Sequence, residues 1–346
     1  MQPLTLATVP ATLRTKALAQ LWRDFDVSAI ENLRESYERV GKQFGEGYWN
    51  ALVGSFRGKE LTGVAWIEPQ PGRVAAFHGP ILSSREQATT NRQLVSLAME
   101  HAIALRVRLI QCLRRDGELA EALALLEHGF HRVTSLLYMR ADNSLLSENC
   151  LWENRGKPAH FAAPGERALA VPLPADGSWT SSEYPATSLR FETYASATRD
   201  RLAAIIEKTY VGSLDCPAVD GFRTINDVLD GYAATGVHDP NRWRIVSAKL
   251  SPHGALIDVG CVLLAEQPLT GQWELMYMGV VPAARGRGWG LEIVRHAQWM
   301  AWTGGAKSLV LAVDLANEPG VRMYQMAGFQ EFDRRELYLR GFDSVA

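Results

Sequence analysis

A glycine-rich turn between an apolar run and an amphipathic segment is the feature that most restricts how this chain can fold. Residues 274–295 read ELMYMGVVPAARGRGWGLEIVR. Residues without a Cβ let successive backbone N–H groups converge on an anion, and a following helix adds the positive end of its dipole. The segment therefore predicts a strand, an anion-binding turn and a helix, as in α/β folds. A tight turn that carries solvated arginines is the simpler alternative.

Two common phosphate-binding motifs do not fit this turn. A P-loop requires a Gly-Lys pair, and none stands in the segment. A dinucleotide fingerprint requires a third glycine where Leu291 stands, and no acidic residue follows about 20 residues later at a strand end to hold a ribose. The turn is therefore suited to a phosphate ligand of another kind.

The order of expected elements is repeated along the chain. Residues 109–130 and 309–329 each read as a strand, a short loop, an amphipathic helix and Gly-Phe, so that Gly129 corresponds to Gly328. A chance match of two helix ends is the alternative. We interpret the pattern as a duplication, because the elements ahead of each match also correspond. The first copy has no glycine turn, which indicates that it kept the fold and lost the chemistry.

A chain of 346 residues is long enough for two domains. We expect one domain over residues 1–150, a connector rich in Pro, Gly, Ser and Asn over 151–187, and a second domain over 188–346. Alternating strands and helices place both in the α/β (α+β) class, each with a mixed central sheet flanked by helices.

Charge and cysteine content exclude several classes of protein. A net charge of −2 creates no field that would attract nucleic acid or a membrane surface. There is no run of 18 apolar residues and no apolar segment typical of a signal peptide, so we expect a cytoplasmic protein. The four cysteines are far apart, which predicts reduced thiols and no metal site. They are Cys112, Cys150, Cys216 and Cys261.

The turn resembles the acyl-CoA-binding motif of the GNAT superfamily of N-acetyltransferases. That motif reads V-x-P-x-x-R-G-x-G-x-G and matches residues 280–290. Two further features stand in register with it. The family pattern V-x-x-x-N followed by L/M-Y-x-x-x-G-F is met at Val313, Asn317, Met323, Tyr324, Gly328 and Phe329. Glu274 stands eleven residues before Arg285, where some branches of the family carry a general base.

The resemblance implies two tandem GNAT-like domains, with acetyl-CoA bound to the second. The amides of Gly286–Leu291 would hold the pyrophosphate, and the backbone of Met278–Val280 would pair with pantetheine like an added strand. The Val280 N–H would polarise the thioester carbonyl. Asn317 would contact the cofactor or cap the following helix. The implied cofactor-binding residues are Met278, Gly279, Val280, Arg285, Gly286, Arg287, Gly288, Trp289, Gly290, Leu291 and Asn317.

Two residues are candidates for the proton transfers. Glu274 would act as the general base. Strand alternation predicts that its side chain lies on the same face as those of Met278 and Val280. The alternative is a partly exposed glutamate with a structural role only. Tyr324 would protonate the leaving thiolate, and its alternative is a tyrosine that only packs on its helix. Other branches of the family carry the base five residues before the Asn, where this chain has Ala312.

The family builds its acceptor pocket in the segment that is here 213–232. Asp215, Arg223 and Tyr232 are candidates for selecting a polar acceptor, although ordinary loop contacts and helix caps are the favoured explanation for each of them. The expected function is direct transfer of acetyl from acetyl-CoA to a primary amine, on a small molecule or at a peptide N-terminus or lysine, by a monomer or homodimer. The alternatives are a regulatory module that binds acyl-CoA without catalysis and a peptidyl or aminoacyl ligase.

Overall fold

The computed structural model describes residues 2–23, 27–83, 88–115, 119–142, 189–251, 253–267 and 270–342. The chain forms two compact units, each drawn from several stretches of sequence. Unit 1 comprises Met1–Leu136, Ala218–Gly231 and Arg334–Ala346, and unit 2 comprises Leu137–Pro217 and Tyr232–Asp333. The connector expected at 151–187 and Cys150 lie outside the described residues.

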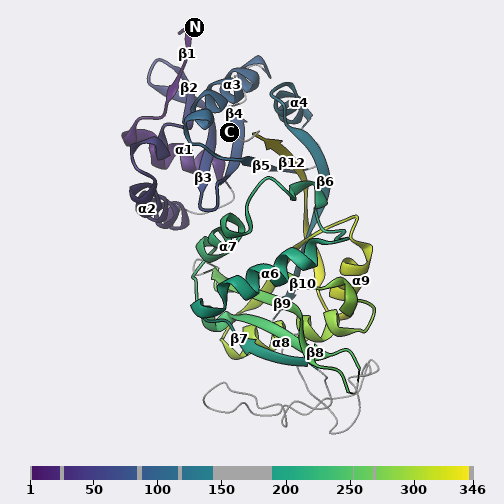
Figure 1. Ribbon diagram of the computed structural model, residues 1–346. Helices are drawn as coiled ribbons and strands as arrows, with labels where there is room; N and C mark the ends of the chain where they lie inside the picture. The colour runs from purple at the N-terminus through teal and green to yellow at the C-terminus, as the bar shows by residue number, and fades with distance from the viewer. Residues whose placement is uncertain are drawn as a thin grey trace. The chain divides into compact units, whose positions relative to one another are not determined.

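Unit 1 contains a six-stranded mixed sheet in the order β1-β2-β3-β4-β5-β12 (Figure 1). Its strands are β1 (Leu4–Thr8), β2 (Leu52–Arg57), β3 (Glu60–Gln70), β4 (Val74–Leu82), β5 (Leu109–Arg114) and, from residue 334, β12 (Gln330–Gly341). Only β4 and β5 run parallel, and a parallel pair needs a crossover, which α3 provides. The helices of the unit are α1 (Arg14–Leu21), α2 (Val27–Phe44), α3 (Ala88–Ala104) and α4 (Leu119–Glu127).

Packed aromatic rings fill the core of unit 1 on the α1 side of the sheet. Trp66 is fully buried and stacks on Trp49 with ring centroids 5.2 Å apart. Trp22, at the end of α1, packs against the His78 ring of β4 at 4.9 Å. His78 Nε2 lies 2.7 Å from the carboxylate of Glu68. Large rings in contact leave no room for a ligand among them.

Unit 2 repeats this architecture with the sheet order β7-β8-β9-β10-β11-β6. Its strands are β7 (Leu189–Thr193), β8 (Trp243–Lys249), β9 (Leu256–Gln267), β10 (Gln272–Val280), β11 (Ser308–Asp314) and, from residue 137, β6 (His131–Asp142). Its parallel pair is β10 and β11. The helices are α6 (Arg199–Tyr210), α8 (Trp289–Thr303) and α9 (Glu318–Met326), while α7 (Ile225–Ala234) has residues in both units.

The two helix ends aligned in the sequence have the same structure. Gly129 and Gly328 follow α4 and α9 with φ of 79° and 86°, a left-handed conformation that favours glycine. Each is followed by a buried phenylalanine, Phe130 or Phe329. Together with the repeated order of strands and helices, these ends confirm the predicted pair of α/β copies.

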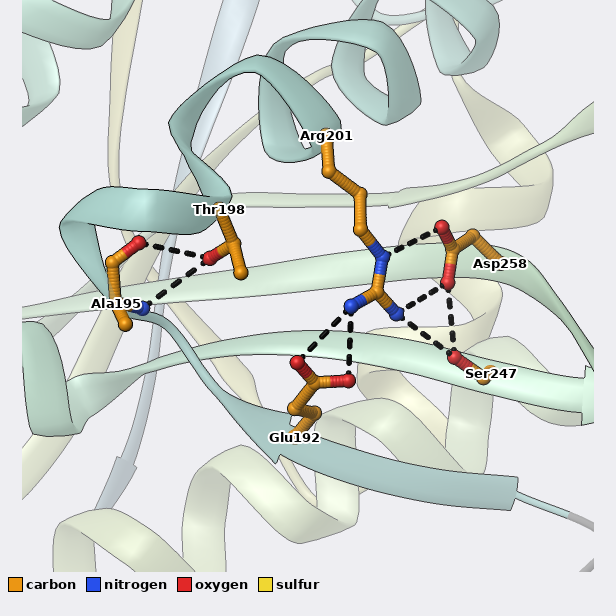
Figure 2. A network of polar contacts seen from close by, with 6 residues as sticks. All are labelled: Glu192, Ala195, Thr198, Arg201, Ser247 and Asp258. Atoms are coloured by element: carbon orange, nitrogen blue, oxygen red, sulfur yellow. Dashed lines mark hydrogen bonds and ion pairs between the residues drawn. The ribbon is translucent and has the colours of Figure 1, made fainter.

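An arginine on α6 ties that helix to three strands of unit 2 (Figure 2). Arg201 donates to both carboxylate oxygens of Asp258 on β9, at 2.8 and 2.6 Å. Its remaining nitrogen donates to both oxygens of Glu192 on β7, at 2.9 Å. Ser247 on β8 donates to the same Asp258 at 2.9 Å. Two paired carboxylates on one planar guanidinium fix the orientation of α6 on the sheet.

Replacing Arg201 with methionine is expected to lower the free energy of unfolding by about 1–2 kcal/mol, because both carboxylates lose a bidentate partner. The side chain is only partly buried, which keeps the effect small. Arg322→Met removes an exposed ion pair with Glu318 and is expected to change stability by less than about 0.5 kcal/mol.

Urea unfolding of both variants measures this difference. Arg201 lowers the pKa of Asp258, so the stabilisation is present at neutral pH and is lost as the pH falls below 3.8, through that lowered pKa. Equal stabilities of the two variants at pH 7 would contradict the role assigned to Arg201.

Candidate active site

A β-bulge in β10 decides which side chains of this strand face the helices α6 and α7. Glu274 pairs with Ala265 of β9, and Tyr277 pairs with Leu263, so Met276 is the additional residue of the bulge. Ala265 and Leu263 are two positions apart on β9 and share a face. Glu274 and Tyr277 therefore share a face as well, although three positions separate them.

Because of the bulge, the predicted alternation of side-chain faces along β10 is wrong. Strand periodicity put Glu274 on the same face as Met278 and Val280, whereas the observed register groups it with Tyr277 and Gly279. A Cβ on Gly279 would lie 2.7 Å from the side chain of Thr209 on α6, which shows that this face is covered by α6. A one-residue bulge exchanges the faces of every residue that follows it.

The parallel strands β10 and β11 are paired at one end only. Their register contains Trp273 with Leu309 and Glu274 with Val310. In the described residues β10 continues to Val280 without further pairing to β11. The strands thus separate beside Met278–Val280, and an extended ligand can add main-chain hydrogen bonds at such a gap.

A cavity of about 700 Å³ follows this gap and ends at the glycine turn. Its size is typical of a small-molecule site. The lining residues come from the end of α6 and the loop after it, from β10, from the turn and the start of α8, and from α9. They include the predicted residues Met278, Gly279, Val280, Arg285, Gly286, Arg287, Gly288, Trp289, Gly290, Leu291, Asn317 and Tyr324.

The glycines of the turn serve different purposes. Gly286 and Gly288 have φ of 75° and 77°, and a Cβ on either would meet no atom within 4 Å. Gly288 is the N-cap of α8, where backbone N–H groups lack intrahelical acceptors. Gly290 has another role, since a Cβ there would lie 2.7 Å from the sulfur of Met323 on α9. Leu291 N–H donates to the Gly288 carbonyl at 3.1 Å, so this amide is already satisfied within the turn.

The two arginines of the turn are held differently. Arg285 donates to the carbonyl oxygens of Val280, Gly212 and Thr209 at 3.0, 3.0 and 2.8 Å, which joins the turn to the end of α6. Arg287 donates to one carbonyl at 3.3 Å and lies over the Trp289 ring at 5.3 Å. Arg285 thus shapes the turn, while Arg287 holds its charge over the start of α8.

Asn317 and Tyr324 line the same cavity from α9. Asn317 caps the helix, because its side-chain oxygen accepts the Gly320 N–H at 3.1 Å. Tyr324 is buried and its ring packs on Phe329 at 5.8 Å. Burial raises the pKa of the Tyr324 phenol, and the nearby Asp215 carboxylate raises it further. The phenol therefore keeps its proton at neutral pH, as a general acid must.

Glu274, on β10, is half-buried and does not line the cavity. One of its carboxylate oxygens accepts the side-chain N–H of Gln267 at 2.8 Å. Burial raises the pKa of Glu274, and the hydrogen bond from Gln267 opposes that shift only in part. Such a carboxylate is more basic than one in water.

Three residues of the site carry no sequence motif or only a weak one. Tyr277 faces α6, where its hydroxyl is hydrogen-bonded to Thr209, and both line the cavity. Asp215 lines it from the loop after α6 and accepts the Asp314 N–H at 2.9 Å, while Asp314 accepts the Cys216 N–H at 3.1 Å. The sequence offered two weak signals: a tyrosine two residues before the glycine of a strand end, and the place of Asp215 in the segment where the family builds its acceptor pocket.

The described residues contain no group of three or more His, Cys, Asp or Glu side chains that is arranged to hold a metal ion. In the same residues no helix is long and apolar enough to cross a membrane. Cys112, Cys216 and Cys261 carry reduced thiols.

The strand, turn and helix of this site match a known family. Residues 229–329 match the family described as "Acetyltransferase (GNAT) family". Through this region, which is less than a third of the chain, the protein is similar to the GNAT family of acetyltransferases. The matched residues contain the bulged strand, the glycine turn, Asn317 and Tyr324.

Similar proteins agree with this assignment. A mycothiol acetyltransferase from Corynebacterium efficiens is 24% identical over 212 residues, which cover 52% of this chain and 71% of the relative. The crystal structure of a GCN5-related N-acetyltransferase from Sphaerobacter thermophilus has a TM-score of 0.59 at 16% identity and covers 99% of this chain and 97% of that one. A glucosamine N-acetyltransferase region of a fungal GH3 β-N-acetylglucosaminidase has the same TM-score at 12% identity, covering 98% of this chain and 38% of that one.

The structural likeness extends over both units, since the Sphaerobacter chain is covered almost from end to end. At these identities it shows the fold alone. It confirms the predicted class, two tandem GNAT-like domains with mixed sheets flanked by helices.

Proposed function

We propose that unit 2 is an N-acetyltransferase that transfers the acetyl group of acetyl-CoA to a primary amine in a ternary complex. One observation carries this proposal: a single cavity joins the glycine turn, the gap between β10 and β11, and the buried phenol of Tyr324. Anion-binding amides, an unpaired strand edge and a proton donor are the three features that a pyrophosphate, a pantetheine arm and a leaving thiolate require.

The residues of the turn fit acetyl-CoA as a substrate. Gly286 and Gly288 leave open space over backbone amides at the start of α8, and Arg287 adds positive charge there. Met278–Val280 would pair with the pantetheine arm, and Asn317 lines the same cavity. The Val280 N–H would donate to the carbonyl oxygen as negative charge develops on it.

The proposed reaction needs one base and one acid. The acceptor enters as an ammonium ion, and Glu274 removes a proton through a water molecule, because its carboxylate does not line the cavity. The amine nitrogen then attacks the carbonyl carbon, a C–N bond forms and the C–S bond breaks. Tyr324 gives its proton to the leaving sulfur, and the second proton that the nitrogen loses after attack restores the Tyr324 phenol. The products are an amide and the free thiol of CoA, with one proton released.

Unit 1 is proposed to have no transfer activity. His78 lies on β4, the strand that corresponds to β10, and its ring packs against Trp22 and the buried Trp66 at 4.9 and 5.9 Å. The aromatic core of unit 1 thus fills the sheet face that corresponds to the cavity-lining face of the sheet in unit 2. The part of the chain that corresponds to the glycine turn falls partly outside the described residues.

A thiol-release assay with acetyl-CoA and a panel of primary amines tests the proposed function. We expect amine-dependent release of free CoA thiol and an acetylated amine of the corresponding mass. The second candidate function is a regulatory module that binds acyl-CoA without turning it over. Tight binding of acetyl-CoA with no thiol release for any amine would favour that second function over transfer.

Replacing Glu274 with glutamine is expected to lower kcat by about 10²–10⁴-fold and to remove the acid limb of the pH–rate profile. The base works only when ionised, so the wild-type rate rises with pH through the raised pKa of Glu274. Glu207→Gln, at an exposed position of α6, is the control and should keep both rate and profile. Identical profiles for wild type and Glu274→Gln would assign the base elsewhere.

A further inference from the structure

Asp215 is the carboxylate that lines the cavity beside the proposed reaction centre. The described cavity-lining residues include two carboxylates, Asp215 and Glu292. Glu292 lies in the first turn of α8, beside the glycine turn. Asp215 lies on the loop after α6 and lines the cavity together with Tyr277, Asn317 and Tyr324. Its hydrogen bond with the N–H of Asp314, at the end of β11, places it near the start of α9, the helix that carries Tyr324.

The Asp215 carboxylate is anchored without being neutralised. Its Oδ1 accepts the Asp314 N–H at 2.9 Å, and the side chain of Asn317 is a second hydrogen-bond partner. No Lys or Arg side chain of the described residues forms an ion pair with it. The neighbouring Asp314 adds a second negative charge, although its own oxygens accept the N–H groups of Cys216 and Ala316.

The surroundings of Asp215 favour an incoming cation. The residue is accessible from the cavity, yet protein surrounds it, and this partial loss of water raises its pKa, which the hydrogen bond from the Asp314 N–H lowers only in part. Tyr277 presents an aromatic ring on the same cavity wall, packed against Tyr232 at 5.5 Å and Tyr210 at 6.0 Å. A carboxylate without a cationic partner beside aromatic rings is a recurrent arrangement for binding ammonium groups.

We propose that Asp215 binds the ammonium group of the acceptor amine and so selects cationic acceptors. This inference rests on the proposed function, because it assigns the acceptor end of the same cavity. Asp215 holds the nitrogen near the thioester, and Glu274 receives the proton. Three hydrogen bonds fix the loop after α6: Arg285 donates to the Gly212 carbonyl, the Asp314 N–H donates to Asp215, and the Cys216 N–H donates to Asp314. The Asp215 carboxylate is therefore held in place before the acceptor binds.

Two thioethers of CoA test this role without knowledge of the natural acceptor. S-(2-aminoethyl)-CoA carries an ammonium group near the position of the attacking nitrogen, and S-propyl-CoA is its neutral counterpart of similar size. Isothermal titration is expected to show that wild type binds the aminoethyl compound about 10- to 100-fold more tightly, the range of a charge-assisted hydrogen bond. Asp215→Asn should abolish this preference and leave the affinity for S-propyl-CoA within about twofold.

Asparagine suits this test because its side-chain oxygen can still accept the Asp314 N–H, so only the charge is lost. Glu292→Gln removes the other cavity carboxylate and should keep the wild-type ratio of the two affinities. A wild-type protein that binds both compounds equally would overturn the role of Asp215 and leave acetyl-CoA binding intact. A wild-type protein that binds neither would overturn the proposed function itself. An unchanged preference in Asp215→Asn would assign the ammonium site to another residue.

Discussion

Replacing Gly288 with glutamate is expected to weaken binding of acetyl-CoA by more than about 100-fold. Gly288 has a φ of 77° and caps α8 at the end of the cavity. The new carboxylate would lie where the turn offers N–H groups to an anion, and it would repel the pyrophosphate directly. Because a Cβ at this position meets no atom within 4 Å, the protein itself has room for the side chain.

The structure supplies a matched control for this variant at the other end of the same helix. Gly305 has a φ of 81°, and a Cβ there also meets no atom within 4 Å. Gly305→Glu therefore imposes the same backbone strain, about 1–2 kcal/mol, and adds the same charge away from the cavity. Isothermal titration with acetyl-CoA should show wild-type affinity for Gly305→Glu. Wild-type affinity for Gly288→Glu as well would remove the turn from the cofactor site.

Replacing Tyr324 with phenylalanine is expected to lower kcat by about 10²–10³-fold and to leave the dissociation constant of acetyl-CoA within about twofold. The phenylalanine keeps the ring contact with Phe329 and loses only the hydroxyl. Without that proton donor, the thiolate must leave as an anion into a cavity from which much of the water is excluded. Steady-state thiol release and isothermal titration measure the two quantities separately.

Tyr194→Phe provides the control for the tyrosine substitution. Tyr194 is equally buried in unit 2, packs on Trp243 at 5.2 Å and does not line the cavity. Removing the Tyr194 hydroxyl should leave kcat unchanged. Parallel losses of turnover and of acetyl-CoA affinity in Tyr324→Phe would make Tyr324 a packing residue rather than the acid.

Much of the fold was predictable because its determinants are local in sequence. Helix and strand periodicity, a Gly-Phe helix end in each half and the glycine turn are set by neighbouring residues. The turn also pointed to the position of the cavity, since backbone N–H groups at a helix N-terminus are suited to an anion. Asn317 as a helix cap followed from its place before Pro319 in the same way.

The acceptor end of the site was not predictable from local patterns. The bulge in β10 follows from pairing with β9, and it moved Glu274 from the face of Val280 to that of Tyr277. Asp215 acquires its place through the Asp314 N–H, which is 99 residues away along the chain. Neither contact has a signal in the residues that surround it.

The sequence by itself determined the class of each element and the conformation of the glycine turn, because both depend on residues within a few positions of one another. Only the tertiary structure decided which strand completes each sheet, which face of β10 meets α6, and which carboxylate lines the cavity beside Tyr324. These outcomes depend on hydrogen bonds between segments that are far apart in the chain, whose pairing register is set by the packing of the whole unit.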